Sequence, residues 1–201
     1  MQKGMMPKPL FLSQRKRLRD RLSRSSPLTV QRSDDRFSFD APGSEGIMTI
    51  KIITATEAKK SKLWEMLSDY LKELSQYGDV DLEYPFFDRY WTDDDRWPHL
   101  IFKDESIVGF ALVNTWSPTG KDADFAIAEF YVLPEFRNAG VGRQAFCHLL
   151  HNRSGIWELG VMSCNEAAKA FWERILTTTN ISEIERFNLK NELVYRFSYR
   201  A

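Results

Sequence analysis

Residues 137–146 read RNAGVGRQAF, and they place Gly140 and Gly142 one residue apart just before a helical pattern. Glycines at a helix start leave consecutive backbone N–H groups uncovered, and the positive end of the helix dipole lies at the same point. The stretch therefore predicts an anion site, flanked by Arg137 and Arg143 as a clamp for pyrophosphate. A plain turn with a helix cap is the alternative, for which one glycine would be enough.

The segments on either side place this turn between a strand and a helix. Residues 125–133 (FAIAEFYVL) are typical of a strand, and residues 141–150 repeat apolar side chains with the helical period. Upstream, residues 99–116 predict a β-hairpin that turns at Asp104 and Glu105, with strands apolar enough to be central in a sheet.

The same alternation extends through the rest of the body and predicts a mixed α/β fold. Residues 49–55 predict a strand, after which Thr54 and Glu57 match a capping box at a helix start. Residues 79–98 read as irregular, and residues 155–161, 165–175 and 193–200 predict a strand, a helix and a closing strand. The first helix would bury the apolar face formed by Leu63, Leu67, Tyr70, Leu71 and Leu74.

Composition favours a soluble protein that binds no metal. Of 201 residues, 43% are apolar and 28% charged, and no run approaches the roughly 18 apolar residues of a membrane span. Cys147 and Cys164 lie in apolar patterns and have no metal-ligand spacing, so we expect buried free thiols in a reducing, cytoplasmic location. The histidines, which show no ligand pattern either, are His99, His148 and His151.

Charge separates the chain into two parts. Residues 1–47 hold 10 Lys and Arg against 5 Asp and Glu, whereas residues 48–201 hold 18 against 23. We expect residues 1–47 to be a basic, disordered extension and residues 48–201 to be the domain. A nucleic-acid arm or a transit-like helix is the alternative for SQRKRLRDRLSR, residues 13–24, but a nucleic-acid partner is not favoured.

Two common phosphate motifs fit the glycine turn poorly. No Gly-Lys-Ser/Thr follows the glycines, which excludes a P-loop. The dinucleotide fingerprint G-x-G-x-x-A is matched as far as Ala145, and Glu158 would mimic its ribose-binding acid. However, seven residues separate Val132 from Gly140 and only about one βα unit remains, which argues against a dinucleotide fold.

Taken from Arg137, the turn is similar to the V-x-P-x-x-R-x-x-G-x-G signature of the GNAT family of N-acetyltransferases. Downstream, NEAAKAFW from Asn165 resembles that family's N-x-x-A-x-x-F-Y motif. The resemblance covers essentially residues 48–201. The signature residues are Val132, Pro134, Arg137, Gly140 and Gly142.

The resemblance implies a mixed sheet, flanked by helices, that splays open between its fourth and fifth strands. It implies that acetyl-coenzyme A lies in the gap and that the backbone of Phe130, Tyr131 and Val132 binds its pantetheine arm. Asn165 would contact the cofactor from the next helix start, and Phe171 with Trp172 would pack near the thiol, although core filling is an equal alternative for Phe171. The residues implied to bind pyrophosphate are Arg137, Asn138, Ala139, Gly140, Val141, Gly142 and Arg143.

The implied reaction moves an acetyl group to a primary amine, which needs a base. Deprotonating such an amine at pH 7 costs roughly 4 to 5 kcal/mol. Glu129 is the first candidate for the base, and Glu158 on the neighbouring strand is the alternative. Trp172 stands where the family often has an acidic tyrosine, so water, Tyr131 or Tyr90 would protonate the thiolate. A non-catalytic acyl-coenzyme A sensor is therefore the alternative function.

Residues 79–95 (DVDLEYPFFDRYWTDDD) carry seven acids against one base, with aromatic residues between them. Such a segment would bind a cationic amine, whether a small molecule or the amine of a peptide or protein. In the alternative, its aromatic residues fill the core and its aspartates cap short helices. A homodimer is one further expectation, and a membrane is not. The predicted acceptor-site residues are Tyr84, Asp88, Tyr90 and Trp91.

Overall fold

The computed structural model describes residues 49–151, 153–178 and 181–201. The predicted extension, residues 1–47, lies outside the described residues, so the predicted boundary at Met48 stays a prediction. Among the helices described, none combines the length and the apolar character needed to cross a membrane.

The two cysteines are free thiols, but neither is fully buried. Cys147 is half-buried, and Cys164 is exposed because it lies in a turn. The prediction that both thiols are buried was therefore wrong.

The first strand and helix are joined without the predicted capping box. Strand β1 (Ile50–Thr54) leads into a 3-10 turn, η2 (Glu57–Lys59), and then into α2 (Lys60–Leu74). Thr54 remains in the strand, and the N-cap of η2 is Thr56, whose side chain makes no capping hydrogen bond. The prediction was wrong because a tight 3-10 turn, which the capping-box pattern does not anticipate, precedes the α-helix.

The predicted hairpin is confirmed, with β2 (Arg96–Lys103) and β3 (Ser106–Asn114) joined by a turn in which Asp104 has a φ of 53°. The predicted strand, turn and helix follow as β4 (Phe125–Val132), η5 (Pro134–Phe136) and α3 (Val141–Leu150). The remaining elements are η3 (Ser75–Tyr77), η4 (Asp88–Tyr90), β5 (Gly155–Met162), α4 (Glu166–Thr178), β6 (Ile181–Asn188) and β7 (Glu192–Tyr199).

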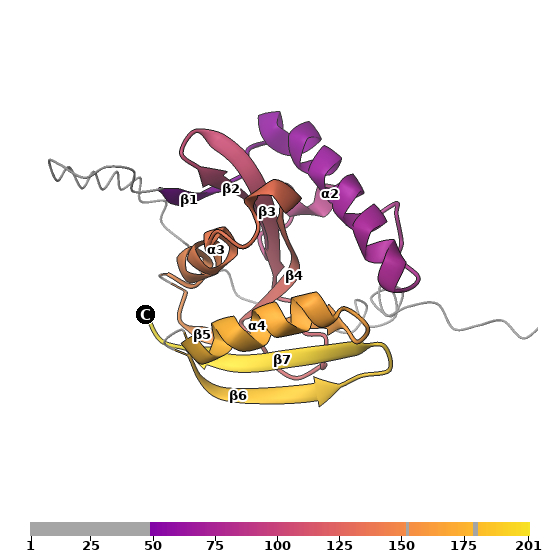
Figure 1. Ribbon diagram of the computed structural model, residues 1–201, viewed down its shortest axis with the longest axis vertical. Helices are drawn as coiled ribbons and strands as arrows, with labels where there is room; N and C mark the ends of the chain where they lie inside the picture. The colour runs from indigo at the N-terminus through magenta and orange to yellow at the C-terminus, as the bar shows by residue number, and fades with distance from the viewer. Residues whose placement is uncertain (1–48, 152, 179–180) are drawn as a thin grey trace, which may run out of the picture. The chain divides into compact units, whose positions relative to one another are not determined.

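These strands form one mixed sheet in the order β1-β2-β3-β4-β5-β7-β6, which confirms the α/β prediction. Only the β4–β5 pair is parallel. Strand β6 was not predicted, and it places β7 inside the sheet, between β5 and β6 (Figure 1).

Helices cover both faces of the sheet, as alternate residues of β4 show. The ring of Phe130 contacts Trp172 of α4, with 5.3 Å between centroids, whereas the ring of Tyr131 contacts Tyr70 of α2 at 5.3 Å. Neighbouring side chains of a strand point to opposite faces, so α2 lies on one face and α4 on the other. Figure 1 shows α2 and α3 on opposite sides of β3 and β4, and α4 lying along β5 and β7.

The sheet splits where β4 and β5 stop pairing. Their parallel ladder joins only residues 125–127 to residues 157–159, although both strands continue. The register between β3 and β4 shifts at the same point, so that Ala128 bulges between Ile127 and Glu129. A bulge bends its strand, and this one turns the end of β4 away from β5. The splay predicted between the fourth and fifth strands is therefore present.

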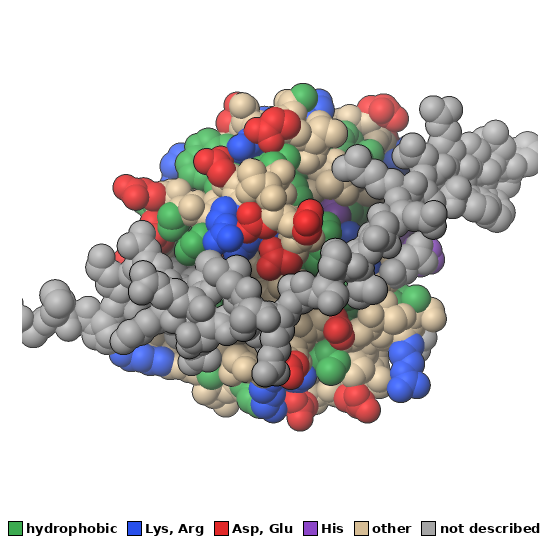
Figure 2. Space-filling model, turned by 180° about the vertical axis from the view of Figure 1, so that it is seen from behind, with side chains coloured by type: hydrophobic (Ala, Val, Ile, Leu, Met, Phe, Trp, Pro, Cys, Tyr) green, Lys and Arg blue, Asp and Glu red, His purple; other side chains and the backbone are tan. Residues whose placement is uncertain are grey.

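The described surface is acidic in places but not uniformly so. Figure 2 shows acidic side chains interspersed with basic ones on the side opposite to that of Figure 1. This distribution fits the modest excess of acids over bases in residues 48–201.

Candidate functional site

The glycine turn leaves the start of α3 open to a ligand. Gly140 is the N-cap residue and has a φ of 78°, a left-handed conformation that favours glycine. The N–H of Gln144 donates to the carbonyl oxygen of Gly140 at 3.1 Å and so begins the helical ladder. The N–H groups of Val141, Gly142 and Arg143 precede that first bond, so they point out of the helix end.

Gly142 lets helix α4 approach this turn closely. A Cβ atom at Gly142 would lie 2.8 Å from Cζ and 2.9 Å from Cε2 of the Phe171 ring. Any other residue here would push the ring away, so the glycine is required by packing as well as by exposure of the backbone. The turn has the backbone conformation that an anion site would need, and the anion site itself stays a prediction.

The predicted pyrophosphate clamp by Arg137 is not found. Its two terminal nitrogens bind the carboxylate of Glu73 on α2 at 2.8 and 2.7 Å, and its Nε donates to the carbonyl oxygen of Val132 at 2.8 Å. Its backbone N–H donates to Pro134 O at 3.2 Å. Arg137 therefore ties the glycine turn to α2, whereas Arg143 is exposed in the first turn of α3.

In the downstream motif, which begins at Asn165, the side chains make contacts that differ from those predicted. Asn165 caps α4, because its Oδ1 accepts the N–H of Ala168 at 3.0 Å. Trp172 is 6% exposed and packs against Phe146 at 5.2 Å between ring centroids, so it is core. Phe171, for which core filling was the equal alternative, is the residue that lies against the glycine turn.

Glu129 is buried at the point where the sheet splits. Only 4% of the residue is exposed, and within the described residues its Oε1 has no hydrogen-bond partner. Burial raises the pKa of Glu129 to about 8, while hydrogen bonds from Tyr70 and Tyr84 lower it and the nearby Glu192 raises it further. A carboxyl with this pKa exchanges protons near neutral pH, which is what a base for an amine requires.

Tyr84 and Tyr90, two of the predicted acceptor-site residues, lie beside Glu129. Both side chains are buried, and burial raises the pKa of Tyr90 to about 12. The Tyr90 hydroxyl accepts a hydrogen bond from Asn114 Nδ2 at 3.3 Å, and the guanidinium of Arg96 lies 5.4 Å from its ring centroid. The surroundings of Glu129 on this side are therefore the phenol groups of Tyr84 and Tyr90, which are protonated at neutral pH.

The other two predicted acceptor-site residues, Asp88 and Trp91, lie elsewhere. Asp88 pairs with Lys60 at 3.1 Å, and the same ammonium group lies 5.0 Å from the Trp91 ring centroid. The Trp91 Nε1 donates to the carbonyl oxygen of Ala55 at 2.9 Å. These residues anchor the irregular segment to Ala55 and to the start of α2, and Asp88 does not cap a helix as the structural alternative for the segment predicted.

Tyr131, a predicted catalytic and pantetheine-binding residue, follows Glu129 by two positions on the same strand. Its ring lies 5.3 Å from the Tyr70 centroid and 5.3 Å from the Arg137 guanidinium. Burial raises its pKa, so its hydroxyl carries a proton at neutral pH.

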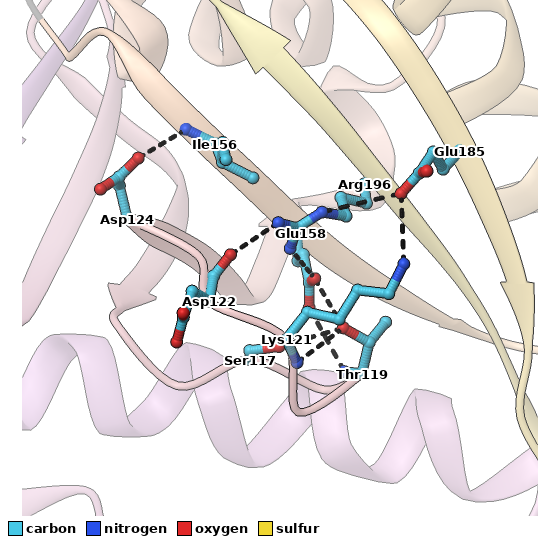
Figure 3. A network of polar contacts seen from close by, with 9 residues as sticks. All are labelled: Ser117, Thr119, Lys121, Asp122, Asp124, Ile156, Glu158, Glu185 and Arg196. Carbon is cyan, nitrogen blue, oxygen red and sulfur yellow. Dashed lines mark hydrogen bonds and ion pairs between the residues drawn. The ribbon is translucent and has the colours of Figure 1, made fainter.

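Both carboxylate oxygens of Glu158, the alternative base, are already bound by other side chains. It is fully buried, and its oxygens bind Ser117 Oγ at 2.7 Å, Thr119 Oγ1 at 2.7 Å and Arg196 Nη1 at 2.5 Å (Figure 3). Figure 3 shows this carboxylate holding the 117–124 loop against β5 and β7. It lies on the paired part of β5, opposite Ala126, and the structure therefore makes it an anchor of the loop.

Sequence reasoning missed three residues around the split. Tyr70 was assigned only to the apolar face of its helix, although a tyrosine on such a face usually has a partner for its hydroxyl. No local sequence pattern pointed to Glu73 or Glu192, because the residues that they contact, Arg137 and Gly160, lie far along the chain. Glu192 begins β7 beside the end of β5, and burial raises its pKa.

Comparison with known proteins gives one family and many similar folds. Residues 62–176 match the profile of the Acetyltransferase (GNAT) family. A search of curated proteins found no match to the chain.

Three solved structures illustrate the likeness of fold. An acetyltransferase from Thermus thermophilus is 15% identical, with 76% of this chain and 99% of that chain covered and a TM-score of 0.58. PaiA N-acetyltransferase from Thermoplasma acidophilum, in complex with coenzyme A, is 13% identical over 76% and 100% of the chains, with a TM-score of 0.50. Diaminobutyrate acetyltransferase EctA from Paenibacillus lautus, in complex with L-2,4-diaminobutyric acid and coenzyme A, is 13% identical over 75% and 95%, with a TM-score of 0.54.

Proposed function

Because this chain belongs to the acetyltransferase (GNAT) family, we propose that it is a cytoplasmic N-acetyltransferase that moves an acetyl group from acetyl-coenzyme A to a primary amine. The observation that carries this proposal is Glu129, a buried carboxyl with an unpartnered oxygen at the split between β4 and β5. A base at this point would meet an amine on one side of the gap and a thioester on the other.

The residues around the glycine turn fit acetyl-coenzyme A as the donor. The outward N–H groups of Val141, Gly142 and Arg143 would bind the pyrophosphate, with the exposed Arg143 side chain beside them. The backbone of residues 130–132 has no strand partner on the β5 side, so its groups other than the Val132 carbonyl, which Arg137 Nε binds, are available to the pantetheine amides. The PaiA structure that contains coenzyme A has the same fold.

Glu129 begins the reaction by taking a proton from the entering ammonium group. The freed nitrogen lone pair attacks the thioester carbonyl carbon, and the C–S bond then breaks as the C–N bond of the amide is completed. The second amine proton leaves the nitrogen, and the thiolate gains one. The products are the N-acetylated amine, coenzyme A as the thiol, and one proton held by Glu129.

The proton for the thiolate has a candidate donor in Tyr131. Trp172 is unable to supply it, because an indole N–H is not acidic and because this side chain is core. Tyr131 lies on the strand that lines the gap and keeps its proton at neutral pH. Releasing the thiolate unprotonated would cost only about 2 kcal/mol at pH 7, so a weak donor is sufficient.

The test is release of coenzyme A in the presence of a panel of amines. The panel holds L-2,4-diaminobutyrate, 1,4-diaminobutane, a peptide with an amino-terminal alanine and a peptide with an internal lysine. We expect release with at least one amine, and a matching acetylated product by mass spectrometry. Tight binding of acetyl-coenzyme A with no release for any amine would instead identify the protein as an acyl-coenzyme A sensor, the alternative that Trp172 motivates.

The position of the donor has its own test. Gly142→Asp puts a side chain against the Phe171 ring and a negative charge beside the proposed phosphate site, so we expect at least about a 10-fold loss of acetyl-coenzyme A affinity by calorimetry. Glu105→Asp, a change in the β2–β3 turn, is the control. Unchanged affinity in Gly142→Asp would refute this placement.

A further inference from the structure

We propose that Glu192 and Glu129 together bind the acceptor as an ammonium ion, so that the substrate is an unhindered aliphatic amine entering in its cationic form. This inference rests on the proposed acetyl transfer and adds the chemical class of its acceptor. It assigns a role to Glu192, which the sequence did not single out.

The first observation is the missing side chain at Gly160, in β5. Leu159 and Val161 on either side are buried and face α3 and α4, whereas Gly160 is exposed. Glu158 and Met162 share the face of Gly160, because side chains alternate along a strand. Between these two residues, just past the point where β4 stops pairing with β5, the strand therefore presents bare backbone on this face.

Glu192 lies against Gly160. Its carboxyl carbon and both oxygens are 3.5 Å from the position that a Cβ atom of Gly160 would take. Residue 192 pairs with Met162 in the β5–β7 ladder, so the carboxylate reaches diagonally across β5 toward the split. A side chain at position 160 would contact that carboxylate, and glycine supplies none.

Glu129 lies on the neighbouring strand, β4, just past the point where β4 and β5 stop pairing. Its Oε1 is buried and unpartnered, and its charge is close enough to that of Glu192 to affect it. Tyr70 and Tyr84 supply hydrogen bonds to Glu129, and Tyr90 and Arg96 complete that side of the site. No cation among the described residues pairs with either carboxylate.

Two carboxylates with phenol rings around them define a ligand of particular chemistry. A primary ammonium has three donors, enough to bind both carboxylates and one phenolic oxygen. Its charge offsets the cost of ionising two neighbouring acids, of which Glu129 is buried and Glu192 half-buried. An amine with a carboxylate on the adjacent carbon would be repelled, so we expect alkyl amines and lysine side chains to be accepted and α-amino groups of free amino acids to be rejected.

The decisive variant is Glu192→Gln, with Glu105→Gln in the β2–β3 turn as a control of equal charge change. The acceptors are 1,4-diaminobutane, which is cationic at pH 7, and O-methylhydroxylamine, which is uncharged there. Loss of a hydrogen bond to a charged group should raise KM for diaminobutane about 10- to 100-fold in Glu192→Gln. The rate with O-methylhydroxylamine and the affinity for acetyl-coenzyme A should stay within about twofold of those of the control.

Equal losses with both acceptors, or a Glu192→Gln variant that behaves like Glu105→Gln, would overturn the inference while leaving acetyl transfer intact. If neither of these acceptors and no amine of the earlier panel releases coenzyme A, the proposed function fails instead. Calorimetric titration of 1,4-diaminobutane into the protein saturated with coenzyme A then tests Glu192 by itself, and absence of heat in the unmodified protein refutes the ammonium site. Adding the lysine peptide to the same assays distinguishes a free diamine from a lysine side chain as the source of the amine.

Discussion

Glu158 and Glu129 are both buried carboxyls on neighbouring strands of one sheet, but their surroundings are opposite. Glu158 lies where β4 and β5 pair and is bound by a serine, a threonine and an arginine. Glu129 lies where the strands have separated and keeps an oxygen without a partner. A buried acid therefore helps to hold the fold together when hydrogen bonds and a cation satisfy its carboxylate. It is available for chemistry when an oxygen lacks such partners.

The largest effect should come from Glu129→Gln, which keeps the shape of the side chain and removes the base. We expect turnover with the best amine to fall by about 10³-fold, equivalent to about 4 kcal/mol. In the wild type, kcat/KM should rise with pH up to the pKa of Glu129, about 8, and the variant should lose that dependence. Steady-state kinetics across this range is the measurement, and a wild-type profile in Glu129→Gln would remove it from the mechanism.

Glu158→Ala should cost stability and leave the chemistry in place. It removes the nearest carboxylate from Arg196, whose side chain is 14% exposed, and frees the 117–124 loop, so we expect the free energy of unfolding to fall by about 3 kcal/mol. Chemical denaturation measures this change, with Glu185→Ala, at the exposed edge of the same network, as the control. If Glu158→Ala had the stability of the wild type but lost turnover, Glu158 and not Glu129 would be the candidate base.

The two carboxyls should also differ in how they link stability to pH. The pKa of Glu129 is raised by folding from 4.5 to about 8, so the folded state binds a proton that the unfolded state has lost, and stability decreases as pH rises between these values. Glu129→Gln removes this dependence. The free energy of unfolding of the variant minus that of the wild type should therefore increase by about 2 kcal/mol from roughly pH 6 to pH 7.5.

Comparing the wild type with Glu129→Gln at each pH separates the contribution of Glu129 to stability from that of His99. Burial lowers the pKa of His99 from 6.5 to about 3, so His99 destabilises the fold as pH falls below 6.5 in both proteins. Denaturant titrations at a series of pH values give the difference. A constant difference between the wild type and Glu129→Gln would mean that Glu129 is ionised in the folded protein throughout the range.

The smallest effect should come from the surface of the Glu158 network. Lys121 lies 3.6 Å from Glu185, and both side chains are about half exposed. Lys121→Met keeps an apolar contact for the Phe187 ring, over which the Lys121 ammonium lies, and should change the free energy of unfolding by about 0.5 kcal/mol or less. A loss as large as that of Glu158→Ala would show that the network depends on its exposed rim.

Local patterns were enough to predict the elements that have strong periodicity. The hairpin around Asp104, the helix after the glycine turn and the strand that carries Glu129 all follow from apolar spacing. Strand β6 does not, because its register shifts between Ser182 and Glu185 and Glu183 has a φ of 54°, which breaks the alternation expected of a strand.

The candidate site could be predicted only in part, because its contacts join distant segments. The turn from Asn138 to Gly142 is local, and the structure has the expected backbone. The pairing of Arg137 with Glu73, and of Glu158 with Arg196, depends on how the elements pack, which residue spacing alone does not specify. The segment 79–95 shows the same limit, since Tyr84 reaches Glu129 while Asp88 turns to Lys60.

The position of β7 inside the sheet has a consequence for synthesis of the protein. This strand supplies Arg196 to one buried acid and Glu192 to the neighbourhood of the other, and it pairs with β5 and β6 at once. Neither environment is complete until residues 192–199 have emerged from the ribosome. Until then Glu158 lacks its arginine and β5 lacks its antiparallel neighbour, so folding would be completed after translation of this strand, when β7 joins both neighbours.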